Sequence, residues 1–113
     1  MSNDDAYVLD MLRSAMLARQ FAEGCSEQQF LEDIKTQSAV LHQLTLLGEA
    51  VRRISDGFRK LHPDVPWNEI AGMRNRIVHD YDEIDLDRVW EVLHRDLPGL
   101  IPALKSIAQT EPS

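Results

Sequence analysis

The sequence contains few of the residues that cross-link or interrupt a fold. Its one cysteine, Cys25, excludes an intramolecular disulfide and a cysteine-rich zinc site. Five glycines and five prolines in 113 residues leave no linker and no low-complexity segment, and no stretch alternates as a half-buried strand does. No apolar run approaches the roughly 18 residues of a membrane-spanning helix. These absences exclude a β-rich fold, a disulfide-stabilised fold and a membrane-spanning fold.

Length and composition are those of an ordinary globular chain. The 113 residues fit one domain, which we expect to cover residues 1–113. Hydrophobic residues make up 43% and charged residues 27%, a balance that does not favour disorder. The first ten residues are acidic and lack the order of a signal peptide, which is basic residues followed by an apolar run. We therefore expect a cytoplasmic protein.

Charge is unevenly distributed along the chain. The net charge of −7 argues against indiscriminate nucleic-acid binding. Residues 35–81, however, carry seven basic and five acidic side chains and three of the four histidines, whereas both flanks are acidic. If a polyanion binds, we expect it to bind this middle region. The alternative is that these charges belong to solvated helix faces.

The apolar spacing predicts an all-α bundle of four to five helices with short connections. The third helical segment is apolar over much of its girth, and we expect it at the centre of the bundle. We expect helices over about residues 4–22, from 26 onward, over 36–54, from 55 to 61, from 66 or 67 to 78, and from 85 through 107.

Local features predict several boundaries and packing sites. Ser26 has the spacing of a capping box, and residues 80–85 (DYDEID) are expected to form a loop with Asp85 as the next N-cap. Pro98 and Pro102 are expected to kink or split the last helix.

The large and the very small side chains suggest where the chain packs. Trp67 and Trp90 are more easily explained as core residues than as interface residues. The isolated glycines Gly48 and Gly72 lie inside helices, where a glycine often marks close helix packing.

The helix expected to begin at residue 66 or 67 holds the candidate functional residues. At 100° per residue, its core face consists of Ile70, Met73 and Ile77. Asn75 and His79 then point away from the core, and Arg74 lies on the flank between the two faces. Histidine transfers protons near neutral pH, and arginine grips a phosphate and stabilises charge that develops on it. This set suits attack of an RNA 2′-hydroxyl on its phosphodiester, although a structural or incidental histidine is the alternative.

Other chemistries are less favoured. The four histidines lie on separate segments without metal-ligand spacing, so we expect no metal and no cofactor. Cys25 has no local base and is a weak candidate nucleophile. One chain offers one suitable histidine, whereas transesterification benefits from a separate acid and base. A two-fold homodimer would supply both, with its axis near the face of Asn75 and His79.

The segment over residues 66–81, PWNEIAGMRNRIVHDY, resembles the hallmark of HepT-like toxins in the HEPN-domain superfamily. That hallmark is an arginine, a polar residue, three further positions, a histidine, any residue and a tyrosine. Arg74, Asn75, His79 and Tyr81 stand at the matching positions of this sequence. The resemblance extends over nearly the whole chain.

The resemblance implies an all-α dimer whose two motifs form a composite ribonuclease site, with Arg74 and His79 catalytic and Asn75 in support. The upstream residues 48–50 (GEA) also resemble the family. A further implication is a partner, an MntA-type nucleotidyltransferase antitoxin usually encoded alongside. In some members this antitoxin transfers AMP from ATP to the motif tyrosine, which here is Tyr81. Without the resemblance, Tyr81 would be interpreted as a loop tyrosine packed on the bundle.

Further basic residues are candidate RNA contacts: Arg52, Arg53, Arg59, Lys60 and Arg76. For the first four, favourable placement near a helix C-terminus is the competing interpretation. The sequence thus predicts a metal-independent endoribonuclease toxin that acts as a homodimer. A non-catalytic helical module that binds a nucleotidyltransferase and nucleotide is the alternative, and a helical adaptor without a ligand is a third.

Overall fold

The computed structural model describes residues 3–110, and within that range the chain is helical and contains no strand. The helices are α1 (Asn3–Phe21), α2 (Glu27–Glu32), α3 (Ile34–Arg53), α4 (Asp56–Leu61), α5 (Trp67–His79), the 3₁₀ turn η1 (Tyr81–Glu83), α6 (Leu86–Glu91), the π-helical segment η2 (Val92–Asp96) and α7 (Leu97–Thr110). The all-α prediction is confirmed. The predicted domain over residues 1–113 includes residues 1–2 and 111–113, which lie outside the described range.

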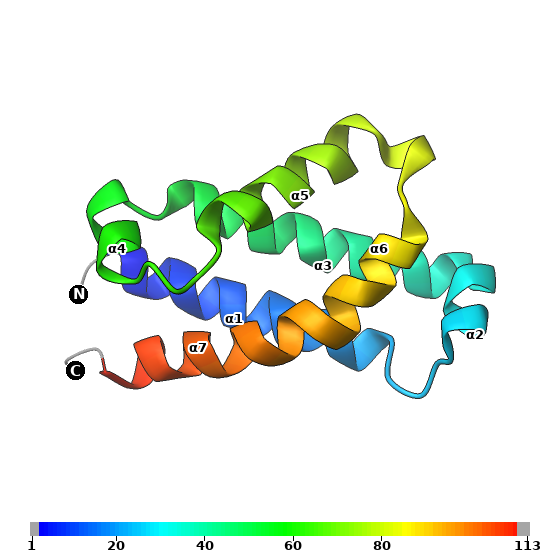
Figure 1. Ribbon diagram of the computed structural model, residues 1–113, viewed down its shortest axis with the longest axis horizontal. Coiled ribbons are helices and arrows are strands. Elements are labelled where there is room, and N and C mark those ends of the chain that lie inside the picture. Colours follow the sequence, from blue (N-terminus) through cyan, green and yellow to red (C-terminus); the bar gives the residue numbers. More distant parts are fainter. Residues whose placement is uncertain (1–2, 111–113) are drawn as a thin grey trace.

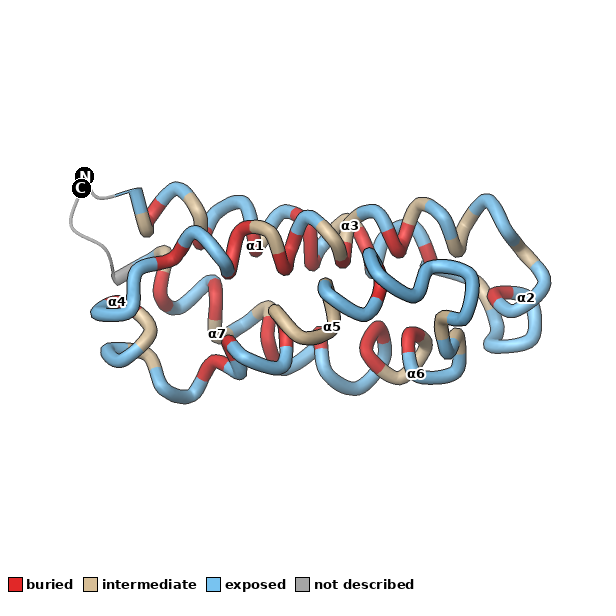
Figure 2. Tube along the Cα trace, turned by 90° about the horizontal axis from the view of Figure 1, so that it is seen from above, coloured by how far each residue is buried: buried red, intermediate tan, exposed pale blue. Residues whose placement is uncertain are grey.

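Four long helical segments form an up-and-down bundle (Figure 1). α1 and α3 lie side by side, α5 packs along α3, and the continuous rod of α6, η2 and α7 returns along α1. Buried residues line the inner sides of these segments, as Figure 2 shows for α1 and α3. α3 contacts α1, α2 and α5, so its predicted central position is confirmed. Among the described helices, none has the length and hydropathy that a membrane span requires.

Side-chain caps fix the short helices as the sequence predicts. The Ser26 hydroxyl accepts a hydrogen bond from the backbone N–H of Gln29, while the Ser26 N–H donates to the Gln29 side chain, which completes the capping box at α2. The Asp85 carboxylate caps α6 and is confirmed as its N-cap.

The long helix α3 begins two residues earlier than the predicted start at residue 36. The carboxylate of Asp33 accepts the backbone N–H of Thr36 at 3.1 Å, so helical backbone starts at Ile34. At the other end of α3, Ser55 caps α4, and Asp4 of α1 accepts both the backbone N–H and the hydroxyl of Ser55 at 2.8 Å. These bonds tie the start of α1 to the turn between α3 and α4.

The last helix is not split at Pro102, which lies inside α7. The irregularity comes earlier, where the backbone N–H of Leu97 donates to the carbonyl of Val92 in a π turn. In that register the carbonyl of Leu93 would pair with residue 98, but Pro98 has no N–H. Arg19 of α1 donates to the Leu93 carbonyl instead, at 2.7 Å, and so satisfies the freed acceptor.

The two tryptophans differ in burial. Trp67 is buried, and its indole N–H donates to the carbonyl of His62 at 2.9 Å, as expected of a core residue. Trp90 is only half-buried, with its ring centroid 5.5 Å from Phe30 and 3.8 Å from the exposed ring of His94. The prediction of a core position is therefore correct for Trp67 and wrong for Trp90, which lies at the edge of the core.

Candidate functional site

α5 presents the predicted site residues on the faces that the sequence assigns to them. Ile70 and Ile77 are buried against the bundle, whereas Asn75 and His79 are exposed. Arg74 is half-buried on the flank between them. The helix runs one residue further than predicted and includes His79 in its last turn. The structure thus places Arg74, Asn75 and His79 on adjoining faces of one helix.

Arg74 is placed by the closest approach of α5 to α3. A Cβ atom at Gly48 of α3 would overlap the Cβ of Arg74 and would lie 3.3 Å from the carbonyl oxygen of Ile70. Only a glycine at position 48 lets the two helices come this close. The expectation that Gly48 marks close helix packing is confirmed.

The guanidinium of Arg74 is held by a carboxylate from α3. Its Nε and Nη2 donate to one oxygen of Glu49 at 3.1 and 2.7 Å, and its Nη1 donates to the side-chain oxygen of Asn75 at 3.0 Å. An arginine side chain has five N–H groups, so two remain free to bind an anion. The side chain of Arg74 is 14% exposed, which restricts its motion while leaving its outer edge accessible.

The charge balance of this site keeps Glu49 ionised. The hydrogen bond from Arg74 holds the pKa of Glu49 below its ordinary value; partial burial opposes this shift, and the charges of Arg74, Arg52 and Arg53 reinforce it. Glu49 therefore neutralises Arg74, while Arg52 and Arg53 in the last turn of α3 add positive charge close by. These two arginines leave positive charge around the ion pair of Arg74 and Glu49.

The sequence does not predict a role for the side chain of Glu49. Its place within the segment 48–50 contributes to the family resemblance and indicates no function for the carboxylate. The one indication in the sequence is its position directly after a glycine that marks a helix contact. Such a residue lies at the edge of the contact, where its side chain reaches the neighbouring helix.

His79 and Tyr81 lie at the C-terminal end of α5. Among the described residues, His79 has no hydrogen-bond partner, and its ring is open to solvent. Tyr81 begins the turn η1 and is 54% exposed, so its hydroxyl is reachable from outside. The turn is a 3₁₀ helix within the segment expected as a loop. Its carboxylates bring negative charge beside His79.

The candidate RNA contacts do not form one track. Arg59 is half-buried, and its Nη2 donates to the Val51 carbonyl at 2.8 Å, which fits the alternative of a helix C-terminal partner. Arg59 and Lys60 belong to α4, at the opposite end of the bundle from the C-terminus of α5 (Figure 1). Arg76 lines a groove on the other flank of α5. In the described part of the chain, no three histidine, cysteine, aspartate or glutamate side chains converge as metal ligands.

Comparisons with known proteins identify a family. Residues 11–107 match the model of the HepT-like ribonuclease family. A Thermococcus cleftensis protein named "Probable ribonuclease HepT" is 36% identical over 83% of this chain and 86% of its own length. A Caldanaerobacter subterraneus protein named as an RNase is 32% identical over 93% of this chain and 94% of its own length. A Methanocaldococcus jannaschii protein named as an RNase is 34% identical over 84% of this chain and 87% of its own length. No solved structure matches the chain.

Proposed function

The chain belongs to the HepT-like ribonuclease family, and on this basis we propose that it is the toxin of a toxin–antitoxin pair, an endoribonuclease that needs no metal ion and acts in the cytoplasm. One observation carries the proposal. Arg74 is fixed by Glu49 and Asn75 with two N–H groups to spare, and the exposed His79 follows five residues later on the same helix. This set supplies an anion-binding group and a proton-transfer group.

In the proposed reaction His79 removes the proton from a ribose 2′-hydroxyl. The 2′-oxygen bonds to the adjacent phosphorus, the bond from phosphorus to the 5′-oxygen breaks, and the leaving oxygen takes up a proton. Arg74 stabilises the additional negative charge on the phosphorane. The products are a 2′,3′-cyclic phosphate and a 5′-hydroxyl end.

We propose that a homodimer forms the complete site. Each chain has one histidine placed for this reaction, whereas separate groups take and give the proton most efficiently. A two-fold axis near the exposed face of Asn75 and His79 would bring the second His79 to the leaving oxygen. An exposed apolar side chain at the same end of α5 supports an interface there, since Val78 is 44% exposed.

The test of the ribonuclease is His79→Ala, assayed on single-stranded RNA in the presence of a chelator. We expect cleavage to fall by at least about a hundredfold, the usual contribution of a general acid–base group. Because His79 is exposed, the melting temperature should not change. His94→Ala, which removes an exposed histidine from η2, is the matched control and should cleave RNA as the native chain does. Full cleavage by His79→Ala would refute the mechanism.

We further propose that a nucleotidyltransferase antitoxin neutralises the chain by transferring AMP to Tyr81. The tyrosine oxygen would attack the α-phosphorus of ATP, releasing pyrophosphate and the phenolic proton. The exposure of Tyr81 supports this step, and its position two residues after His79 explains the inhibition. An added phosphate would place negative charge beside the anion site and obstruct RNA.

Intact mass after incubation with ATP, Mg²⁺ and such an antitoxin tests the modification. We expect mass to increase in steps of one AMP in the native chain and not in Tyr81→Phe. Tyr7→Phe, on the half-buried tyrosine of α1, is the control and should gain mass normally. Equal mass gain by Tyr81→Phe would show that another residue accepts the AMP.

The second candidate function is a non-catalytic helical module that binds the nucleotidyltransferase and nucleotide. The acidic turn after His79 favours it, because Asp80, Asp82 and Glu83 would repel an RNA backbone. This candidate gains support if the pure protein binds the antitoxin and cuts no RNA.

A further inference from the structure

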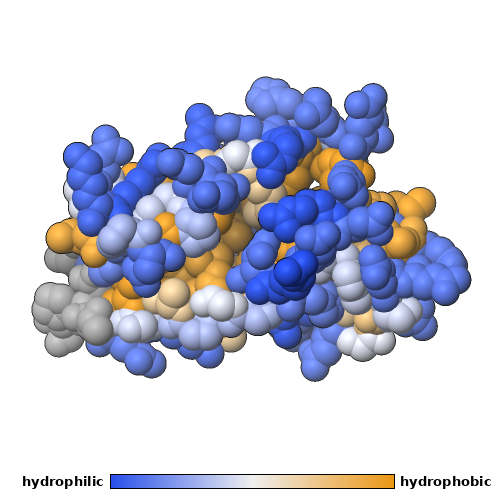
Figure 3. Space-filling model, viewed as in Figure 1, coloured by the Kyte–Doolittle hydropathy of each residue, from blue (hydrophilic) through white to orange (hydrophobic). Residues whose placement is uncertain are grey.

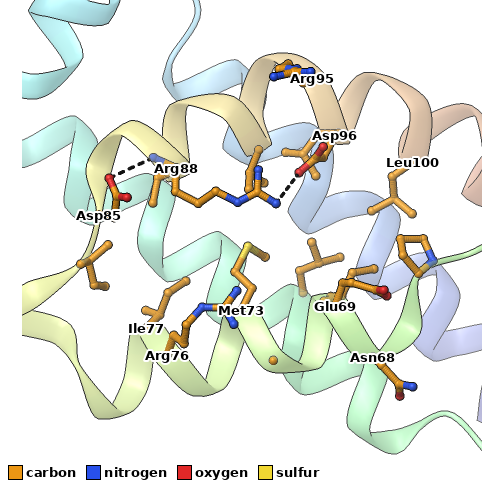
Figure 4. Close-up of a pocket in the computed structure, with 18 of the residues that line it drawn as sticks. Asn68, Glu69, Met73, Arg76, Ile77, Asp85, Arg88, Arg95, Asp96 and Leu100 are labelled. Atoms are coloured by element: carbon orange, nitrogen blue, oxygen red, sulfur yellow. Dashed lines mark hydrogen bonds and ion pairs between the residues drawn. The ribbon is translucent and has the colours of Figure 1, made fainter.

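A groove runs along the flank of α5 that faces away from α3. Because α5 packs along α3, it leaves a cavity of about 790 Å³ between itself and the rod of α6, η2 and α7. Apolar side chains form its floor, including Met73 and Ile77 from α5 and Val89 and Leu100 from the rod. Figure 3 shows apolar surface at the bottom of this hollow between hydrophilic walls, and Figure 4 shows the residues of both walls.

The rim of the groove carries more negative than positive charge. Six acidic and three basic side chains line it. Arg88 is paired with Asp96 at 3.3 Å, and Arg95 lies 3.9 Å from Glu91, so two of the three arginines are already neutralised. Glu69 on the α5 wall has no ion-pair partner among the described residues. The rim therefore repels RNA and attracts a cationic partner.

Two glycines keep the groove open. Gly72 lies in the α5 wall and Gly99 in the α7 wall, both inside helices, where glycine costs about 1 kcal/mol relative to alanine. A Cβ at Gly99 would meet no atom within 4 Å, and one at Gly72 would meet only Nη1 of Arg76 at 3.7 Å. Close helix packing within the chain thus explains the glycine at position 48 but does not explain the glycines at positions 72 and 99. The expectation that Gly72 marks close packing within the chain is wrong.

We propose that this groove binds an amphipathic helix of a protein partner, with its apolar face on the floor and flanking lysines or arginines against the acidic rim. The missing side chains at Gly72 and Gly99 make room for that helix, whose own diameter is about 10 Å. The charge of the rim favours such a helix over RNA. Identification of the partner with the antitoxin rests on the proposed function.

The position of the groove fits that partner. Asp80 and Glu83, which flank and end the turn that begins at Tyr81, both line the groove. A protein seated there would lie beside Tyr81 while the face of Asn75 and His79 remained free. Docking in the groove would therefore hold an enzyme next to the tyrosine that we propose it modifies.

The experiment titrates the full chain with a labelled helical peptide of about 18 residues, with a leucine face and lysine flanks. We expect binding to this peptide and at least tenfold weaker binding to a peptide with glutamate in place of lysine. Gly99→Trp, which fills the groove, should weaken binding at least tenfold, and Glu69→Lys should weaken it several-fold. Gly57→Trp on α4 is the matched control, because a Cβ at Gly57 also meets nothing within 4 Å and lies outside the groove.

Several outcomes would overturn the proposal. The first is equal binding by Gly99→Trp and Gly57→Trp when both retain native helical content; the second is equal binding of the two peptides. The third is conversion of a dimer to a monomer by Gly99→Trp in sedimentation, which would assign the groove to a second copy of the chain. Native protein that cuts RNA but does not bind the lysine peptide overturns the docking site alone. Native protein that binds the peptide but cuts no RNA overturns the ribonuclease alone.

Discussion

The two flanks of α5 differ in how closely another helix approaches them. Toward α3, Gly48 lets the backbones meet, and the side chain of Arg74 lies across the glycine with its charge directed to Glu49. Toward α6 and α7, Gly72 faces open space and the walls are separated by a groove. Gly48 thus allows close helix contact on one side of α5, whereas Gly72 leaves room on the other side.

This difference shows how the structure builds a rigid site beside an open one. A close helix contact fixes the Cβ of Arg74, and the adjacent carboxylate then needs only a short reach to fix its guanidinium. A site held by two helices in contact loses little entropy when it binds an anion. The open flank lacks such contacts and carries unpaired charge at its rim. We therefore expect catalysis on the close flank and partner binding on the open one.

The largest expected effect comes from filling the close flank. Gly48→Ala should move α5 away from α3, because the added methyl would overlap the Cβ of Arg74. Overpacking of this kind costs about 1–3 kcal/mol, partly offset by the higher helix propensity of alanine. RNA cleavage should fall with it, since Arg74 shifts. Chemical denaturation and the RNA assay measure both effects, and unchanged activity together with unchanged stability would contradict the contact.

The next largest effect is expected from a substitution that removes the charge of Glu49 and keeps the size of its side chain. Glu49→Gln keeps the shape of the side chain but removes the ion pair, so the guanidinium of Arg74 is held less firmly. We expect kcat for RNA cleavage to fall about tenfold or more with a smaller change in KM, because Glu49 positions Arg74 and does not touch the RNA. Glu32→Gln, an exposed change on α2, should leave both constants unaltered. A fall in stability without a fall in kcat would make Glu49 purely structural.

The stability difference between the native chain and Glu49→Gln should depend on pH. The pKa of Glu49 is lowered in the folded chain, chiefly by the hydrogen bond from Arg74, from an ordinary value of 4.5. A lowered carboxyl pKa stabilises the fold above that ordinary value, and the stabilisation is lost as the pH falls through the lowered value. The native chain should therefore melt above Glu49→Gln at pH 7, and the difference should shrink toward zero below pH 4.5. A difference that persists unchanged in acid would exclude the ion pair as its cause.

Local patterns in the sequence predict most of the fold. The caps at Ser26 and Asp85 depend on neighbouring residues only, and the faces of α5 depend on helical periodicity, so both follow from the sequence alone. The π turn before Pro98 does not, because it depends on Arg19, a residue 74 positions away from the carbonyl that it satisfies. Long-range compensation of this kind is invisible to periodicity.

The candidate site is predictable only in part for the same reason. Arg74, Asn75 and His79 share one helix, and their relative directions follow from 100° per residue. Glu49 lies 25 positions from Arg74, and only the register of α3 against α5 brings the two together. That register depends on Gly48. The sequence also offers no means to separate Gly48 from Gly72, because the space around a glycine is set by the partner helix.

The smallest expected effect comes from the open flank and has the opposite sign. Gly72→Ala adds a methyl group whose nearest neighbour would be the flexible end of Arg76 at 3.7 Å, so no overlap opposes the gain in helix propensity. We expect the free energy of unfolding to rise by roughly 0.5–1 kcal/mol, because alanine also restricts the unfolded chain. Gly57→Ala, on the exposed surface of α4, provides a matched measure of that gain away from the groove. Chemical denaturation of Gly48→Ala, Gly57→Ala and Gly72→Ala then shows directly which flank of α5 has room for an added methyl group. Destabilisation by Gly72→Ala comparable to that of Gly48→Ala would mean that both flanks of α5 are closed, and the contrast between them would be lost.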